Sequence, residues 1–167
     1  FGLIYGMSAF GLTRQLGIPR NEAQAYLDTY FERYTGVKDY MDSTKELAKK
    51  NLFVETIFGR KLHVATINDP NGLRRKAAER AAINAPLQGS AADIIKKAMI
   101  DVDQWIGVNN PDIKMIMQVH DELIFEVKKE FAVDALNEIV KLMECSVKLK
   151  IPLIVDANQG TNWNEAH

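Results

Sequence analysis

The sequence predicts an α+β fold in which helices pack on antiparallel strands, and three of its features support that prediction. Residues 20–33 repeat apolar side chains every three or four positions, which is the period of one helix face. Residues 53–64 and residues 114–128 are each two apolar runs joined by a short turn, as in a β-hairpin. Hairpins separated by helices are typical of the α+β class.

The first part of the chain is predicted to be helical. Glycines punctuate residues 1–16, where we expect the end of one helix and a short second helix. Pro19 stands just before the amphipathic helix of about residues 20–33, and Gly36 is expected to end that helix. Another helix is expected over about residues 37–50.

The middle of the chain is predicted to change from helix to hairpin and back. Residues 53–64 are expected to form a β-hairpin that turns at Gly59. Two helices follow, at about residues 73–84 and 87–107. Pro86 is expected to separate them, because proline removes a backbone donor and clashes with the preceding turn.

The last part is predicted to begin with a second, tighter hairpin. Residues 114–120 and 122–128 are near-continuous apolar runs around Asp121, so we expect burial on much of both faces. A helix over about residues 130–149 follows, and a last strand is expected near residues 153–157.

Composition allows one ordinary domain with a hydrophobic core. The 167 residues are 47% apolar and 26% charged, which is typical of a soluble globular protein. No apolar run approaches the roughly 18 residues of a membrane span, and no signal peptide is visible. The single cysteine, Cys145, excludes an internal disulfide and suits a reducing compartment. It lies in a helical stretch beside Met143 and Val147, so a small buried thiol is expected.

Charge is unevenly distributed along the chain. The net charge is −1, yet residues 1–100 carry five surplus positive charges and residues 101–167 carry six surplus negative charges. Such a split fits a protein that holds a polyanion and gathers divalent cations, and it also arises by chance. The chain starts with Phe1, without a methionine and inside an apolar pattern, so we expect a fragment with further sequence upstream.

The first group of residues that could carry chemistry is the expected hairpin tip, His120-Asp121-Glu122. A tight hairpin turn usually contains glycine, and two adjacent carboxylates repel each other, so the tip breaks a local rule. Carboxylate oxygens suit Mg²⁺, which usually takes one or two of them together with substrate phosphates. A solvated acidic turn explains the same residues.

The second group is Arg80, Asn84 and Gln88, which are spaced four residues apart on an alanine-rich helix. Their guanidinium and amide groups can reach the minor-groove acceptors that purines and pyrimidines share. Arg74, Arg75 and Lys76, just upstream, could contact phosphates. An ordinary exposed helix face explains the spacing equally well.

The third group is the aromatic pair Phe1 and Tyr5. Four residues separate the two, so they would share a helix face, and the neighbouring glycines Gly2 and Gly6 leave room for a base to stack. An aromatic pair inside a core is the alternative. The three histidines show no metal-site spacing, and the sequence holds no phosphate-binding loop.

Three segments of the sequence resemble the polymerase I family of DNA polymerases, also called family A. In chain order they are FGLIYG, AAERAAINAPLQGSAADIIK and MQVHDELIFEV, and the ending NWNEAH is similar as well. The resemblance covers essentially all of residues 1–167. It implies a DNA-directed DNA polymerase of bacterial replication and repair, cytoplasmic and associated with the nucleoid. It also implies a fingers portion at about residues 1–70 and a palm portion, with antiparallel sheet and catalytic hairpin, at about residues 71–167.

The resemblance implies roles for the residues that face nucleotide and DNA. Phe1 would pack near the sugar of the incoming deoxynucleoside triphosphate, and Tyr5, followed by Gly6, would stack at the templating position. The residues expected to contact the primer–template duplex are Arg80, Asn84 and Gln88, with Arg74 and Arg75 upstream.

The resemblance also implies a catalytic tip. Asp121 would bind the catalytic metals, Glu122 would be a supporting carboxylate, and His120 would lie near the primer terminus. The implied reaction is phosphoryl transfer with two Mg²⁺ ions, one at the primer 3′-hydroxyl and one at the triphosphate and leaving pyrophosphate. Positioning and electrostatics dominate such a reaction.

The resemblance further implies that part of the active site lies upstream of Phe1. The second metal-binding aspartate and the arginine and lysine that bind the triphosphate belong there. Because Asp121 alone cannot hold two Mg²⁺ ions, residues 1–167 by themselves are expected not to polymerise DNA. Two other functions remain open, a non-catalytic duplex-binding module and a Mg²⁺-dependent nuclease, although the scarcity of further clustered carboxylates disfavours the nuclease.

Overall fold

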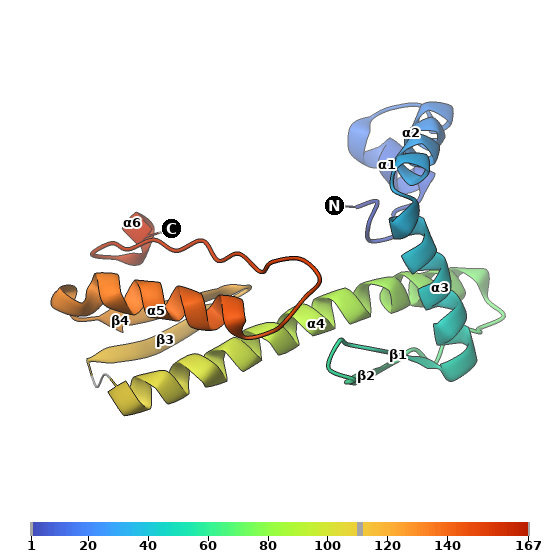
Figure 1. Cartoon of the computed structure of the whole chain (residues 1–167). Coiled ribbons are helices and arrows are strands. Elements are labelled where there is room, and N and C mark those ends of the chain that lie inside the picture. Colours follow the sequence, from blue (N-terminus) through green and yellow to red (C-terminus); the bar gives the residue numbers. More distant parts are fainter. Residues whose placement is uncertain (1, 110–111, 167) are drawn as a thin grey trace. The chain divides into compact units, whose positions relative to one another are not determined.

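The computed structural model describes residues 2–109 and 112–166, which divide into two compact units. The first unit ends at Ser90 and the second begins at Ala91, and the long helix α4 (Gly72–Asn109) contributes to both (Figure 1). The fold class is α+β, as expected: within the described residues, helices accompany two antiparallel sheets of two strands each. None of these helices is long and apolar enough to cross a membrane.

The first unit begins with three helices, α1 (Ala9–Leu16), α2 (Arg20–Arg33) and α3 (Thr35–Asn51). The hydroxyl of Ser8 accepts a hydrogen bond from a first-turn amide of α1, and Gly17 ends that helix at a φ of 68°. The predicted helix over residues 20–33 is confirmed. The buried residues of this core are Leu12, Ala23 and Leu27, with Leu3, Met7 and Phe31 packed against them.

Two predictions for this region are wrong. Residues 2–6 form hydrogen-bonded turns rather than the end of a helix, and the Met7 amide donates to the Gly2 carbonyl oxygen. Gly36 does not end a helix but lies in the first turn of α3, because the helix axis already breaks at Tyr34, whose ψ of 64° is not helical. Packing of α3 through its buried residues outweighs the modest helix-breaking tendency of one glycine.

The first predicted hairpin is confirmed, although its strands are short. Strand β1 (Phe53–Glu55) pairs antiparallel with β2 (Lys61–His63), and Gly59 has the positive φ, 78°, that the turn requires. The hairpin joins α3 and α4 in a second core. Its buried residues are Ala48, Val54, Val64, Ile67, Ala78 and Ala82.

The prediction that Pro86 separates two helices is wrong, since α4 runs through it without interruption. Proline leaves the carbonyl of Ala82, four residues earlier, without its amide partner, which weakens the helix. Ala82 and Ile83 are nevertheless completely or almost completely buried, so tertiary packing holds the helix where local propensity would end it.

The second unit contains the predicted second hairpin. Strand β3 (Ile113–Val119) pairs antiparallel with β4 (Glu122–Val127), and a bulge leaves Ile116 without a cross-strand partner. The bulge makes Met115 and Met117 face opposite sides of the hairpin, since cross-strand pairs on successive rungs alternate between the faces. Ile116 is 55% exposed and Met117 42% exposed, so the prediction that both faces are buried is wrong.

One face of this hairpin is covered by helix α5 (Ala132–Cys145), which follows the short 3-10 helix η1 (Lys129–Phe131) (Figure 1). Their shared core contains Val102, Ile113, Ala135 and Ile139. The helix predicted over residues 130–149 therefore exists but ends earlier, at Cys145. That cysteine is exposed, contrary to prediction. Helix α5 packs on the core through Ala135, Ile139, Leu142 and Met143, and Cys145 is not part of that face.

The predicted last strand is not formed. Residues 153–157 belong to a segment without regular structure that leads to the short helix α6 (Trp163–Ala166). The amide of Val155 donates to a carboxylate oxygen of Glu144 on α5 at 3.1 Å, not to a neighbouring strand. An alternating apolar pattern is therefore not enough to make a strand, which also needs a ladder partner.

Candidate functional site

The tip of the β3–β4 hairpin is a two-residue turn. Val119 pairs with Glu122, so His120 and Asp121 alone connect the strands. His120 has a φ of 53°, in the left-handed region, and the Gln118 amide group donates a hydrogen bond to its carbonyl oxygen. Both turn residues are exposed, whereas Glu122 is half-buried. The hairpin thus projects the Asp121 side chain from a stiff, two-stranded support.

The backbone at His120 is strained. A non-glycine residue in the left-handed region costs about 1–2 kcal/mol, although histidine is one of the types found there more often. Strain of this kind is concentrated at functional sites, because selection for stability alone would place glycine there. Leu52, the C-cap of α3, also has a positive φ, so the outlier at His120 supports a function only together with the adjacent carboxylates of the tip.

The tip can supply part of a metal site. Asp121 and Glu122 offer hard carboxylate oxygens at adjacent positions, and Mg²⁺ usually takes one or two carboxylates along with substrate phosphates. In residues 2–109 and 112–166, no three His, Cys, Asp or Glu side chains gather closely enough to hold a metal ion. The donor set therefore fits a contributor to a Mg²⁺ site, with the remaining oxygens coming from elsewhere.

The first unit carries the second predicted group on one continuous helix. Arg80, Asn84 and Gln88 follow one another at intervals of four residues along α4, and Pro86 lies between the last two. Arg80 and Gln88 are exposed, and Asn84 is half-buried. The structure thus makes the guanidinium and the terminal amide available to a ligand of this helix.

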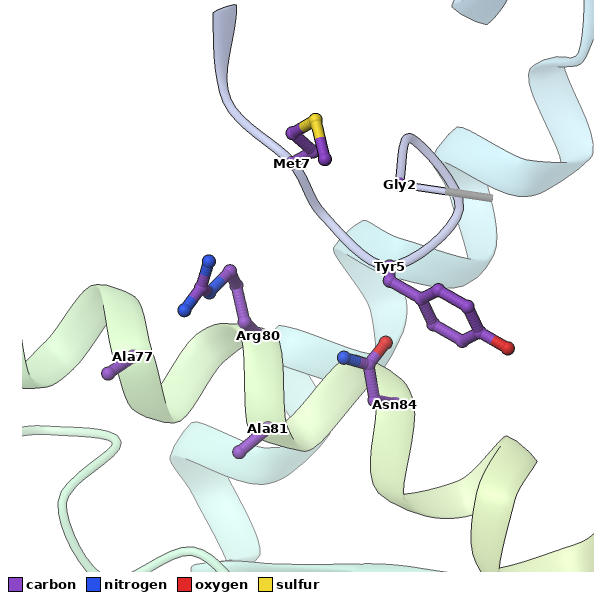
Figure 2. Close-up of a pocket in the computed structure, with 7 residues that line it drawn as sticks. All are labelled: Gly2, Tyr5, Met7, Ala77, Arg80, Ala81 and Asn84. Carbon is purple, nitrogen blue, oxygen red and sulfur yellow. The ribbon is translucent and has the colours of Figure 1, made fainter. Parts of the chain in front are cut away.

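A pocket of about 400 Å³ lies between this helix and the segment before α1. Figure 2 shows Arg80 and Asn84 reaching from α4 toward the segment that carries Tyr5 and Met7. The side-chain oxygen of Asn84 is buried and has no hydrogen-bond partner among the described residues. An aromatic ring beside one unsatisfied amide oxygen suits a flat, polar ligand such as a nucleobase.

Gly6 brings this segment close to the helix. Its φ is +75°, and a Cβ atom there would lie 3.4 Å from Cγ of Arg80 and 3.6 Å from Cδ1 of Ile83. The positive φ favours glycine, whereas a Cβ atom there would make only ordinary van der Waals contacts. The structure therefore brings Tyr5, Gly6, Arg80 and Asn84 together, although Tyr5 stands on a turn rather than on a helix face, and Phe1 lies outside the described residues.

The two arginines at the start of α4 differ in availability. Arg75 is half-buried, and its guanidinium donates to the main-chain oxygens of Asp69 and Pro70, at 3.0 and 3.5 Å. Arg74 is exposed and lies 3.8 Å from the Asp69 carboxylate. Arg74 is thus free to meet a phosphate at little cost, whereas Arg75 also holds the loop before the helix.

Sequence reasoning missed the residues that hold α4 in place. The Tyr40 hydroxyl donates to the Ile83 carbonyl oxygen at 2.9 Å, and Arg60 donates to the Gly89 carbonyl oxygen at 3.0 Å. One signal was available: a glycine inside a helical pattern, such as Gly89, often marks a close approach by another segment. Nothing in the sequence identifies Tyr40 or Arg60 as the partner.

Known proteins resemble this chain along its whole length. A sequence model of DNA polymerase family A matches residues 1–165. The chain is 53% identical over its whole length to DNA polymerase I of Pseudomonas aeruginosa and 49% identical to DNA polymerase I of Rhizobium leguminosarum, and it spans 18% and 17% of those proteins.

A solved structure is similar as well. The POL domain of Pol1 from M. smegmatis, in complex with DNA primer–template and dNTP, superimposes with a TM-score of 0.94 at 42% identity. The match covers 99% of this chain and 29% of that chain. With the family model covering nearly every residue, the chain belongs to DNA polymerase family A.

Proposed function

We propose that this chain is part of a DNA-directed DNA polymerase, which transfers a nucleotidyl group from a deoxynucleoside triphosphate to a primer 3′-hydroxyl. The observation that carries the proposal is the strained, glycine-free tip that presents Asp121 in a family A chain. The relatives named DNA polymerase I, and the similar structure with primer–template and dNTP, support the same reaction. Bacterial DNA in the cytoplasm is the proposed substrate, in replication and repair.

In this proposal the second unit provides the chemical end of the site. Asp121 is a metal ligand, Glu122 supports it, and His120 lies near the primer terminus. Bound Mg²⁺ would supply the positive charge that activates the 3′-hydroxyl and stabilises the leaving pyrophosphate. A further carboxylate from polymerase sequence outside residues 1–167 would complete the site, since the tip offers only two.

The first unit would hold DNA and nucleotide. Arg80 and Gln88 are exposed donors for minor-groove acceptors, which lie at similar positions in every base pair, so geometry is checked without reading sequence. Tyr5, beside the pocket, would stack on the templating base, and Phe1 would pack near the incoming sugar. Residues up to about 70 would be the fingers portion and residues from about 71 the palm portion.

A chimera tests the proposal. Residues 1–167 replace the matching segment of the Pseudomonas aeruginosa DNA polymerase I, and Mg²⁺-dependent primer extension is measured. We expect extension by the chimera and none above background by residues 1–167 alone. A folded chimera that binds primer–template but adds no nucleotide would instead establish a non-catalytic duplex-binding module, and extension by residues 1–167 alone would remove the need for outside residues.

Asp121→Asn in the chimera tests the carrying observation. The change keeps the shape of the side chain but removes the charge, so incorporation should fall roughly 100-fold or more while primer–template binding persists. Asp103→Asn, an exposed aspartate on α4, is the matched control and should change neither. Near-normal incorporation by the Asp121 variant would exclude it as a metal ligand.

A further inference from the structure

Gln88 lies in the turn of α4 that also contains Pro86 and Gly89. Pro86 removes a main-chain hydrogen bond two residues before it, and Gly89, directly after it, is among the poorest helix formers. A helix with both residues in one turn is free to bend or fray there. Contacts from outside the helix would therefore help to fix the direction of the Gln88 side chain.

The turn of the β1–β2 hairpin supplies that support. The guanidinium of Arg60 donates to the Gly89 carbonyl oxygen at 3.0 Å, and the Ile57 amide donates to the Ser90 hydroxyl oxygen at 3.0 Å. The turn itself is tied by the Thr56 hydroxyl, which accepts from the Arg60 amide at 3.2 Å. Two hydrogen bonds thus connect one turn to the two residues that follow Gln88.

The packing at this place is as close as the hydrogen bonding. A Cβ atom on Gly89 would lie 2.8 Å from Cγ2 of Thr56 and 3.1 Å from Cδ1 of Leu62. Thr56 and Ser90 are 5% and 8% exposed, so water cannot readily replace their bonds. The hairpin is fitted to the helix at the position where the helix lacks a side chain.

We propose that Arg60 is a positioning residue for Gln88: by holding the Gly89 carbonyl, it keeps the Gln88 amide directed at the primer–template minor groove. The inference rests on the proposed function, in which Gln88 touches the duplex. Arg60 acts through the helix backbone and contacts no reacting atom. Ser90 supports the same position, because its hydroxyl oxygen accepts a hydrogen bond from the Ile57 amide.

The guanidinium of Arg60 belongs to an exposed residue, so a direct contact with a DNA phosphate is the rival explanation. A phosphate contact and a positioning role predict different salt dependences of DNA binding. Loss of a phosphate contact lowers the slope of log affinity against log salt concentration by about one, whereas loss of positioning leaves the slope unchanged.

A double-mutant cycle in the polymerase that carries this chain tests the inference. Arg60→Ala, Gln88→Ala and the double variant are compared in primer–template KM and kcat. Each single variant should raise KM roughly 3- to 10-fold with little change in kcat, and Arg60→Ala should add nothing once Gln88 is alanine. Arg60→Lys, which keeps one donor, should recover part of the loss.

Matched variants keep the result unambiguous. Lys61→Ala removes a charge from the same hairpin and should leave KM within about twofold, the scatter expected of a surface change. Ser90→Ala should raise KM and, like Arg60→Ala, have no further effect without Gln88. Faster amide exchange at residues 87–90 in Arg60→Ala than in Lys61→Ala would support positioning in a readout that needs no DNA.

Each contrary outcome has one meaning. If the effects of Arg60→Ala and Gln88→Ala multiply, Arg60 acts independently and the inference fails. A salt slope reduced by about one, or an equal effect of Lys61→Ala, also overturns it in favour of a charge contact. If Gln88→Ala itself leaves KM unchanged, the proposed role of Gln88 is what fails.

Discussion

The hydroxyl of Tyr40, on α3, donates a hydrogen bond of 2.9 Å to the main-chain carbonyl oxygen of Ile83, on α4. Ile83 is 2% exposed and stands three residues before Pro86, where the main-chain hydrogen bonding of the helix is incomplete. The phenol thus supplies a donor to a buried carbonyl group near the proline. The bond connects the helix that carries Arg80, Asn84 and Gln88 to the core of the first unit.

Replacing Tyr40 by phenylalanine should therefore destabilise the protein. The ring remains but the donor is lost, so the buried Ile83 carbonyl loses a partner at a cost of about 1–2 kcal/mol in the free energy of unfolding. Denaturant unfolding measures the change. Tyr26→Phe, at a 55% exposed position of α2, is the control and should be nearly neutral; equal effects of the two would remove the special role of Tyr40.

The same phenol predicts a pH dependence. Burial raises the pKa of Tyr40 above its ordinary value of 10.0, and a side-chain hydrogen bond with Thr44 opposes part of that rise. The folded state therefore keeps its proton where the unfolded state loses it. The stabilisation is complete below pH 10 and is lost as pH rises through the pKa of the folded state. Unfolding measured from pH 8 to 11.5 should show this loss, and Tyr40→Phe should lack that part of it.

Two glycines of α4 should respond to alanine with opposite signs. Alanine at Gly89 would place Cβ 2.8 Å from Thr56, and this overpacking costs about 1–3 kcal/mol against a gain of about 1 kcal/mol in helix propensity. Gly107 has nothing within 4 Å, so Gly107→Ala should gain roughly 0.5–1 kcal/mol. Thermal unfolding of both variants measures these changes. A stabilised Gly89→Ala would show that the hairpin residues move aside at little cost.

His120→Gly should separate stability from activity at the hairpin tip. Glycine relieves the strain of a positive φ, so the free energy of unfolding should stay level or rise by up to about 1 kcal/mol. Nucleotide incorporation by the intact polymerase should nevertheless fall if the proposed function is right, because that proposal gives the imidazole a place near the primer terminus. His63→Gly, at an ordinary strand position, should lower stability instead. Unchanged incorporation by His120→Gly would show that His120 only forms the turn and has no role in nucleotide incorporation.

The sequence predicted most elements because their causes are local. Apolar period and turn chemistry were enough for α2 and for both hairpins, including the turn at Gly59. The errors arose where contacts with residues distant in sequence determine the local structure. Pro86 continues a helix that Tyr40 and buried alanines support, and residues 153–157 lack the ladder partner that a strand needs. Periodicity contains no information on either.

The candidate site shows the same division. Arg80, Asn84 and Asp121 stand on the helix and hairpin tip that their spacing predicted, because both elements are local. The pocket beside Tyr5 depends on a turn that folds back on α4, and the anchoring of Gly89 depends on a hairpin about 30 residues earlier in the chain. Only coordinates reveal such contacts.

Because Ile116 has no cross-strand partner, strand β3 can be one residue longer than its partner segment without changing the turn at the tip. All six cross-strand pairs, from Ile113 with Val127 to Val119 with Glu122, are compatible with a chain that lacks Ile116. If every residue of β3 were paired instead, the ladder would slip by one and the connection would grow to three residues. The bulge at Ile116, four residues earlier, thus keeps the turn at two residues and so constrains the backbone at His120. Homologous chains could gain or lose a residue at that position and still deliver the same carboxylate to the same place.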